Sequence, residues 1–301
     1  MSAPLIIICG PTATGKSDLA LEVAEELDGE IINADSMQLY QGMDIGTAKL
    51  SVAERHGIPH HLLDILTVDQ DASVAQYQEL ARKAIDEIRS RGKASIIVGG
   101  TGLYIKSIID EMNFPETDPD LRKKLEDEAE LLGTAAMYSK LRLLDPEAAN
   151  SIEPANTRRI IRALEVIEVT GKPYSANLPS DTSLRYPDAY HFGLSMERAR
   201  LAPRIEARVH RMFEGGLVAE VEQLIDEGLL KGVTAQRAIG YAQTIAYKNG
   251  EISLDEAIAE TIVATRQYVR RQETWFKRDL RIQWILEDQP RLSTVLERIN
   301  S

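Results

Sequence analysis

The chain has 301 residues, which is enough for one large domain or for a core with a smaller one. Its hydrophobic content is 44% and its charged content 27%, and no apolar run reaches membrane-spanning length. The lone cysteine, Cys9, excludes an internal disulfide and a cysteine-based zinc site. We therefore expect a cytoplasmic protein without a signal peptide. A net charge of −12 argues against a nucleic-acid partner unless basic residues cluster locally.

The first stretch of the chain predicts a phosphate-binding loop. Residues 5–9 form a short apolar run, the motif Gly-x-x-x-x-Gly-Lys-Ser follows, and residues 18–27 have helical apolar spacing. In this order the loop amides and the positive end of the helix face a bound phosphate. Lys16 supplies positive charge to phosphate oxygens, and Ser17 supplies a hydroxyl to Mg²⁺. The predicted diphosphate-binding residues are Gly10, Pro11, Thr12, Ala13, Thr14, Gly15, Lys16 and Ser17, with Ser17 as the metal ligand. The motif alone leaves open whether the ligand is a nucleotide or an isoprenyl diphosphate.

A carboxylate follows the second predicted strand. Residues 31–32 indicate this strand, and a helix over residues 73–91 leads to a third strand over residues 94–98. Strand–helix–strand spacing predicts a parallel sheet. Asp35 then lies at the carboxyl edge, where open α/β sheets place their chemistry. We favour a functional role for Asp35, and the alternative is that it caps the next turn.

The third strand is followed by the sequence Gly99-Gly100-Thr101-Gly102. P-loop nucleotide hydrolases usually end such a strand with an aspartate that helps to hold Mg²⁺. The sequence therefore argues against a nucleotide hydrolase. Glycines permit close approach of the backbone to a ligand, and Thr101 offers a hydroxyl at the edge of the sheet.

The composition changes after residue 114. Helical patterns without strands cover residues 120–132, 135–144 and 157–170. We expect an all-helical insertion over residues 115–187 within a P-loop NTPase-like α/β core, formed by residues 1–114 and 188–301, whose parallel sheet is flanked by helices. Within the insertion, arginines flank two isoleucines, and an exposed basic face is the alternative to a binding role. The residues concerned are Arg158, Arg159, Ile160, Ile161 and Arg162.

Three arginines share one face of the helix that follows the next expected strand, over residues 188–194. Arg204, Arg208 and Arg211 fall at helical positions i, i+4 and i+7. An anionic ligand would relieve their mutual repulsion. The alternative is an exposed face without a ligand.

The densest basic and aromatic stretch covers residues 266–278, before a last expected strand over residues 280–286. Arg266, Arg270 and Arg271 are interleaved there with aromatic side chains. This pattern suits RNA, because arginine pairs with phosphate and aromatic rings stack on bases. The alternative is that the aromatic residues belong to the core.

Read together, the motifs closely resemble the bacterial tRNA dimethylallyltransferase (tRNA isopentenyltransferase) family. Several blocks carry the resemblance: residues 10–17, 34–40 (Ala-Asp-Ser-Met-Gln-Leu-Tyr), 44–49 (Asp-Ile-Gly-Thr-Ala-Lys), 98–104 (Val-Gly-Gly-Thr-Gly-Leu-Tyr), 156–165, 265–272 and Trp275-Phe276. The P-loop is shared with many families, whereas the other blocks in series are specific.

The resemblance implies a reaction, namely transfer of a dimethylallyl group from dimethylallyl diphosphate to N6 of adenosine 37, beside the anticodon, in tRNAs that read codons beginning with U. On this view the P-loop holds the isoprenoid diphosphate with Mg²⁺, and a monomer is expected. Asp35 acts as general base, with Lys16, Ser17, Thr101 and Arg204 as further catalytic residues and Arg208 on the diphosphate. The expected tRNA contacts are Asp35, Ser36, Met37, Gln38, Thr101, Arg158, Arg159, Ile160, Ile161, Arg162, Arg266, Arg270 and Arg271.

Two other functions stay open at this point. A P-loop small-molecule or nucleoside kinase would use Asp35 as the base for a hydroxyl group, but it leaves the Gly-Gly-Thr strand end and the basic–aromatic stretch unexplained. A non-catalytic, nucleotide-dependent RNA-binding switch would require that Asp35 be dispensable.

Overall fold

The computed structural model describes residues 3–177 and 184–301, which form two compact units. One unit joins Met1–Ile109 to Tyr186–Ser301, and the other is Asp110–Arg185. These bounds lie near those of the predicted insertion, of which residues 178–183 are outside the described part of the chain.

A six-stranded sheet is the centre of the first unit. Its order is β3-β2-β4-β1-β5-β6, and every described pair of neighbouring strands is parallel, which confirms the expected P-loop-like α/β fold. The strands are β1 (Leu5–Cys9), β2 (Glu30–Asn33), β3 (His60–His61), β4 (Ser95–Gly99), β5 (Tyr190–Leu194) and β6 (Gln283–Ile285). The short strand β3 was not expected from the sequence, because it lies in a stretch rich in glycine and turn residues.

Eight α-helices are described in this unit. Three precede the inserted second unit in the sequence and five follow it. They are α1 (Lys16–Glu26), α2 (Val74–Ser90), α3 (Gly102–Ile109), α8 (Arg198–Glu214), α9 (Leu217–Asp226), α10 (Tyr241–Lys248), α11 (Leu254–Phe276) and α12 (Arg291–Ile299). Short 3₁₀ turns cover Ala53–Arg55 and Ala235–Arg237.

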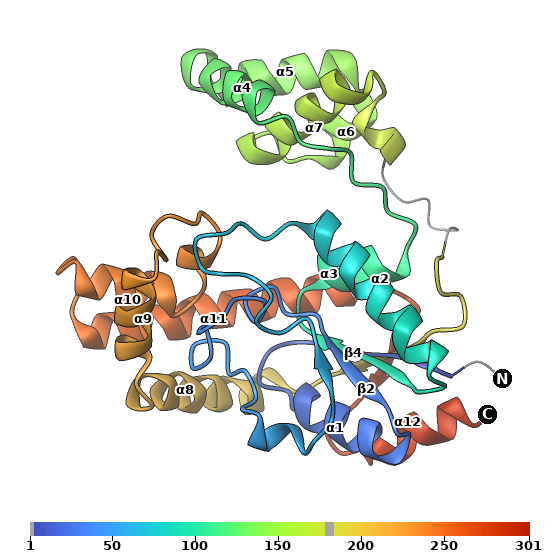
Figure 1. Cartoon of the computed structure of the whole chain (residues 1–301). Helices are drawn as coiled ribbons and strands as arrows, with labels where there is room; N and C mark the ends of the chain where they lie inside the picture. Colours follow the sequence, from blue (N-terminus) through green and yellow to red (C-terminus); the bar gives the residue numbers. More distant parts are fainter. Residues whose placement is uncertain (1–2, 178–183) are drawn as a thin grey trace. The chain divides into compact units, whose positions relative to one another are not determined.

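Both faces of the sheet are covered by helices. Successive side chains of a strand point to opposite faces. Ile6 and Ile8 pack with residues of α1 and α12, whereas Leu5 and Ile7 pack with residues of α2 and α3. Figure 1 shows α1 and α12 on the face opposite α2 and α3. A strand buried on both sides needs apolar residues at every position, which explains the unbroken apolar run of β1.

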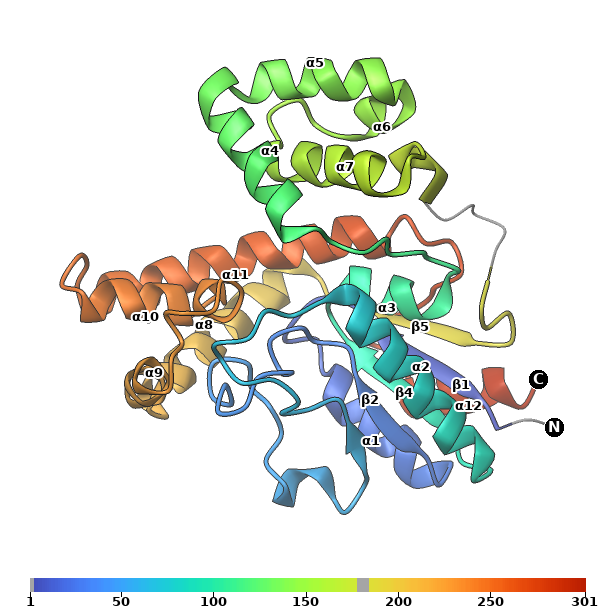
Figure 2. The same ribbon diagram turned by 45° about the horizontal axis from the view of Figure 1, so that its top comes forward.

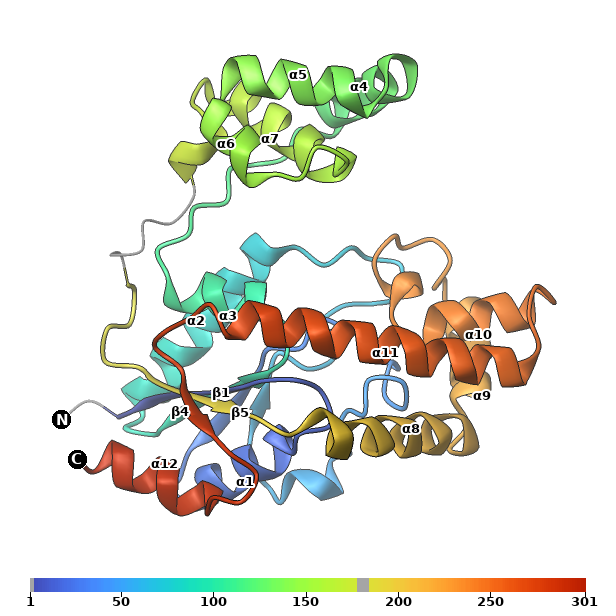
Figure 3. The same cartoon turned by 180° about the vertical axis from the view of Figure 1, so that it is seen from behind.

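A further hydrophobic cluster joins α8, α9 and α10 to the loops that follow β2 and β3. Helix α11 begins at a capping box in which the Ser253 and Glu256 side chains bond to each other's backbone N–H groups. Figure 3 shows this long helix running beside α8. The two helices thereby bring side chains from the C-terminal half of the chain to the loops of the sheet.

The second unit consists of helices, and its own core holds them together (Figure 2). They are α4 (Pro119–Leu132), α5 (Thr134–Leu144), α6 (Pro146–Ser151) and α7 (Thr157–Thr170), followed by a 3₁₀ turn over Tyr174–Asn177. The Asp118, Asp145 and Asn156 side chains cap α4, α6 and α7 by accepting backbone N–H groups.

The described residues include no helix that is long and apolar enough to cross a lipid bilayer.

Candidate active site

The predicted phosphate loop is a tight turn between β1 and α1. Gly10 and Gly15 have φ angles of +132° and +88°, in the region that favours glycine. A Cβ atom at Gly10 would lie 2.7 Å from the Leu194 carbonyl oxygen, so the loop also needs glycine for space. Inside the loop, the Pro11 carbonyl accepts hydrogen bonds from Thr14 Oγ1 (2.8 Å) and Lys16 Nζ (2.7 Å). These hydrogen bonds hold the turn in shape, and the first backbone N–H groups of α1 follow it directly.

This loop forms one wall of a cavity of about 420 Å³. Predicted site residues from several distant segments line it, namely Thr12, Ala13, Gly15, Lys16, Ser17, Asp35, Gln38, Arg204 and Arg208. Arg211, the third arginine of the predicted anion-binding face, also lines it, as do residues that were not predicted, among them Asn33, Thr47, Ala48, Leu50 and Gln272. The parallel sheet thus brings the phosphate loop and the carboxylate after β2 to the same space.

The positive charge around the cavity has no equal negative charge to balance it. Burial and the neighbouring Arg208 guanidinium lower the pKa of Lys16 to about 8, although Asp35 opposes the shift. Burial likewise lowers the pKa of Arg208. Two desolvated cations side by side favour an anionic ligand, because its charge would relieve both desolvation and repulsion.

We expect the affinity for a diphosphate ligand to fall as the pH rises above about 8. The bound diphosphate raises the pKa of Lys16 toward its ordinary value, so binding at about pH 9 takes up a proton that the free protein has lost. The ligand's terminal phosphate loses its last proton near pH 6, roughly, and does not interfere. Calorimetry in buffers of different ionisation enthalpy measures both effects. Lys16→Met should remove the proton uptake; the same uptake in that variant would contradict the assignment.

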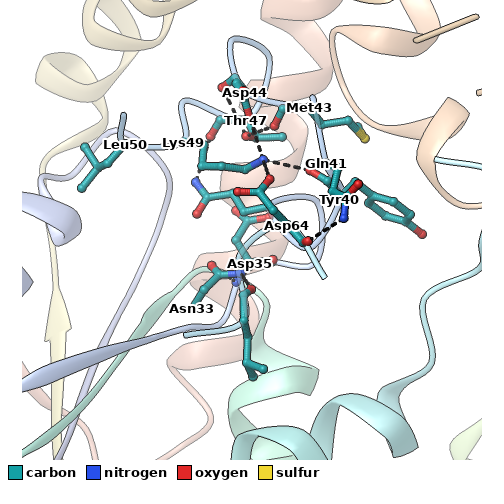
Figure 4. Close-up of polar contacts among 12 residues, drawn as sticks. Asn33, Asp35, Tyr40, Gln41, Met43, Asp44, Thr47, Lys49, Leu50 and Asp64 are labelled. Atoms are coloured by element: carbon teal, nitrogen blue, oxygen red, sulfur yellow. Dashed lines mark hydrogen bonds and ion pairs between the residues drawn. The ribbon is translucent and has the colours of Figure 1, made fainter. Parts of the chain in front are cut away.

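Asp35 lies in the loop after β2, where it closes a turn and lines the cavity. Its Oδ1 atom accepts the Met37 N–H at 2.9 Å, which closes a local turn, and the residue also lines the cavity. Asn33 holds the loop in place, because its amide donates to the Asp35 and Leu62 carbonyls and accepts the Asp35 N–H. Figure 4 shows Asn33 and Asp35 close together at the end of the strand.

Thr101 connects two loops at the carboxyl edge of the sheet. Its Oγ1 accepts the Ser36 N–H at 3.2 Å, and its own N–H donates to the Ala34 carbonyl at 3.2 Å. Ser36, Met37 and Thr101 are not among the residues that line the cavity. Met37 bonds to the cavity residue Asp35, and Ser36 bonds to Thr101. The Thr101 hydroxyl therefore helps to position the loop that carries Asp35.

The glycines at the end of β4 make room for other parts of the protein, and Gly99 and Gly100 also line the cavity. A Cβ at Gly100 would lie 2.2 Å from Gln272 Nε2, and a Cβ at Gly102 would lie 2.1 Å from the Trp275 ring. Similarly, a Cβ at Gly99 would lie 2.2 Å from the Ala34 carbonyl oxygen. Helix α11 and the β2 loop occupy the space that the missing side chains leave.

Gln272 is a site residue that was not predicted. Its side chain accepts the Thr12 N–H at 3.0 Å and donates to the Gly100 carbonyl at 2.9 Å, so it ties the phosphate loop to the loop after β4. The residue is 4% exposed. A polar residue on the otherwise buried helix face of Thr265, Val269 and Phe276 was the available signal.

Gln272→Ala should weaken both the fold and the binding of diphosphate. It leaves the Thr12 N–H and the Gly100 carbonyl without partners, which costs about 1–3 kcal/mol for a buried group. We expect about 2 kcal/mol less unfolding free energy in urea and a higher dissociation constant for a diphosphate ligand. Gln267→Ala, on an exposed position of the same helix, is the control. Equal results for the two variants would contradict this role of Gln272.

The basic residues proposed for RNA differ in their surroundings. Arg266 forms an ion pair with Glu206 of α8, whereas Arg270 and Arg271 are exposed on α11. The Arg271 guanidinium lies 5.6 Å from the centre of the Tyr268 ring. Burial raises the pKa of Tyr268 to about 12, so its hydroxyl stays protonated at neutral pH.

In the helical unit, Arg158 and Arg159 are exposed on α7. Arg162 donates to the buried Glu165 carboxylate at 2.9 Å and to the Pro115 carbonyl at 2.7 Å. The Ile160 and Ile161 side chains are 0% and 6% exposed and belong to the core of this unit, which corrects their expected contact with tRNA. The two isoleucines fix the helix that carries the arginines.

A magnesium ion fits the site only together with a bound diphosphate that supplies further oxygen ligands. The described residues contain no cluster of three or more His, Cys, Asp or Glu side chains that could hold a metal. Ser17 offers one hydroxyl at the cavity. Because Mg²⁺ commonly keeps several waters and takes oxygens from substrate phosphates, this donor set suits an ion that is bound with a diphosphate.

The fold and the phosphate loop define an α/β protein of the P-loop class, with a carboxylate, Asp35, at the cavity that the loop lines. A sequence model of the IPP transferase family matches residues 38–279. The chain is 54% identical to a tRNA dimethylallyltransferase of Streptomyces coelicolor, over 94% of this chain and 90% of that protein. The chain therefore belongs to the IPP transferase family.

Solved structures agree with this assignment. A tRNA isopentenylpyrophosphate transferase from Bacillus halodurans is 40% identical, with a TM-score of 0.72 over 99% of this chain and 94% of that one. A eukaryotic dimethylallyltransferase acting on tRNA is 28% identical, with a TM-score of 0.83 over 99% of this chain and 79% of that one.

Proposed function

We propose that the protein transfers the dimethylallyl group of dimethylallyl diphosphate to N6 of adenosine 37, next to the anticodon, in tRNAs that read codons beginning with U. One observation carries the proposal: the phosphate loop and Asp35 line the same cavity. The family match adds support, because relatives that cover nearly the whole chain are named tRNA dimethylallyltransferases.

Departure of the diphosphate is the first requirement of this chemistry. Breaking the allylic C–O bond places negative charge on the diphosphate, and preorganised positive groups stabilise that charge. Lys16, the amides at the start of α1, and Arg204 and Arg208 face the cavity where the diphosphate would lie. Magnesium held with Ser17 would neutralise further charge on the same oxygens.

The nucleophile is a weak one, because the lone pair of an adenine amino group is delocalised into the ring. Asp35 accepts one hydrogen of N6, directs the nitrogen toward the allylic carbon and takes the proton as the C–N bond forms. A carboxylate is far too weak a base to ionise free adenine. It acts as a general base while the acidity of N6–H rises along the reaction.

The adenosine must leave the stacked anticodon loop to reach this carboxylate. Extruding a base costs a few kcal/mol, and contacts to the neighbouring nucleotides offset the cost. Ser36 and Gln38 lie near Asp35 in sequence and are suited to the adenine edge. Arg158 and Arg159, with Arg270 and Arg271, are exposed and suited to phosphates, so tRNA binding should weaken with salt.

A single assay separates this function from its rivals. The protein is incubated with Mg²⁺, unmodified tRNA and either labelled dimethylallyl diphosphate or labelled ATP. The proposal requires incorporation into RNA from the isoprenoid alone. Phosphate transfer from ATP to a small molecule would support a kinase, and ATP-dependent tRNA affinity without incorporation would support an RNA-binding switch.

A further inference from the structure

A short backbone segment connects the two halves of the cavity. We call residues 44–47 the strap. The Thr47 carbonyl accepts two hydrogen bonds, one from Gln38 Nε2 at 3.2 Å and one from Arg208 Nη2 at 3.2 Å. Gln38 is on the side proposed for adenine and Arg208 on the side proposed for diphosphate. The Thr47 carbonyl oxygen therefore fixes the spacing between Gln38, proposed to contact adenine, and Arg208, proposed to contact the diphosphate.

A single carboxylate on α9 holds the strap by its backbone. Glu220 Oε2 accepts the Ile45 N–H at 2.7 Å and the Asp44 N–H at 3.2 Å, and Oε1 accepts the Gly46 N–H at 3.3 Å. Three successive amides thus converge on one charged acceptor, and hydrogen bonds to a charged acceptor are stronger than those between neutral groups. Glu220 makes all three contacts to backbone N–H groups of the strap and none of the three to its side chains.

Tyr241 of α10 completes the anchor. Its hydroxyl donates to Glu220 Oε1 at 2.5 Å, and the residue is fully buried. A Cβ at Gly46 would lie 2.4 Å from the Tyr241 ring, so the ring packs directly on the strap. Because burial and the Glu220 carboxylate raise the pKa of Tyr241, the hydroxyl remains a donor throughout the working pH range.

Lys49, two residues after the strap, holds the backbone there through hydrogen bonds of its side chain. Its ammonium donates to the Tyr40 carbonyl at 2.8 Å, to Asp44 at 2.6 Å and to Asp64 at 2.5 Å. The side chain is 3% exposed, and its three hydrogens match these three acceptors. Figure 4 shows Lys49 facing Asp44 and Asp64, with Thr47 beside them. The strap is held at both ends before any substrate binds.

We propose that Glu220 is a positioning residue for both substrates, because it fixes the strap whose Thr47 carbonyl holds Gln38 and Arg208. The inference rests on the proposed function for the identity of the substrates. Glu220 touches neither substrate and acts through Thr47. Asp35 and Lys16 do not bond to the strap, so the chemical step itself should depend on Glu220 less than binding does.

Hydrogen exchange tests the anchor without any assay of activity. Glu220→Ala should speed exchange of the Asp44, Ile45 and Gly46 amides by at least about tenfold, because their acceptor is removed. Glu222→Ala is the matched control on the same helix, since Glu222 forms only a surface ion pair with Lys248. Unchanged strap exchange in Glu220→Ala would overturn the anchor.

Kinetics test the consequence for the substrates. Glu220→Ala should raise KM for dimethylallyl diphosphate and for tRNA about tenfold each, with kcat reduced less than about threefold. Glu220→Gln keeps one acceptor oxygen for the strap and should restore most of both KM values. The same variants measured against Glu222→Ala separate this effect from general destabilisation.

Besides unchanged strap exchange, three results would overturn the proposal. One is faster strap exchange with both KM values unchanged, and another is a loss of kcat with unchanged KM. If Glu220→Ala does not fold, Tyr241→Phe is used instead, because it removes one hydrogen-bond partner of the same carboxylate. Unchanged KM values in Tyr241→Phe are the third result. Absence of transfer by the wild-type protein would refute the proposed function instead, and the exchange experiment would still test the anchor.

Discussion

Replacing Asp35 with asparagine should lower kcat about 10²–10⁴-fold, the contribution typical of a general base. The asparagine oxygen still accepts the Met37 N–H, so the local turn is retained while the proton acceptor is lost. We expect tRNA affinity within about threefold of wild type, because RNA binding depends chiefly on phosphate contacts. Single-turnover kinetics and filter binding measure the two quantities.

Asp35→Ala provides the comparison for this prediction. It removes the turn contact as well as the base. A loss of tRNA binding in Asp35→Ala but not in Asp35→Asn would therefore be caused by the changed loop conformation. If Asp35→Asn lost tRNA binding and kept its kcat at saturating tRNA, Asp35 would be a recognition residue and the mechanism would be wrong.

Lys16→Met is expected to have the second large effect, a fall of about 10²–10³-fold in kcat/KM for dimethylallyl diphosphate, comparable to the removal of one preorganised donor. tRNA affinity should not change. Thermal stability at neutral pH should not fall, because the lowered pKa of Lys16 means that its charge is disfavoured in the folded protein without ligand.

Two further variants sharpen the Lys16 prediction. Lys16→Arg should restore little activity, since the planar guanidinium does not replace a compact ammonium in this turn. Lys93→Met removes a lysine that pairs with Asp28 at the surface and should leave kinetics unchanged. A Lys16→Met protein with wild-type KM for dimethylallyl diphosphate would show that the loop does not bind the diphosphate.

Local patterns in the sequence were sufficient to predict the framework of the site. The β1–loop–α1 order follows from an apolar run, two glycines and a helical repeat, and each of these signals is local. Asp35 could be placed beside the loop because parallel strands share one carboxyl edge. Even the short strand β6 was expected, although the observed strand, Gln283–Ile285, is shorter than the predicted one.

The supporting contacts could not be predicted, because they join residues far apart in the chain. Gln272 is 260 positions from Thr12, and Glu220 is 175 positions from Ile45. No periodicity reports which backbone amide a distant side chain will meet. The glycines after β4 illustrate the same limit: the sequence indicated a close approach, but the partners are Gln272 and Trp275 of α11.

The most direct test of the mechanism is a crystal structure with an unreactive thio analogue of dimethylallyl diphosphate and an unmodified anticodon stem-loop. We predict that the diphosphate lies against the phosphate-loop amides and Lys16, and that adenosine N6 lies about 3 Å from an Asp35 oxygen and faces the allylic carbon. A diphosphate bound outside the loop, or an Asp35 side chain turned away from the base, would contradict the mechanism.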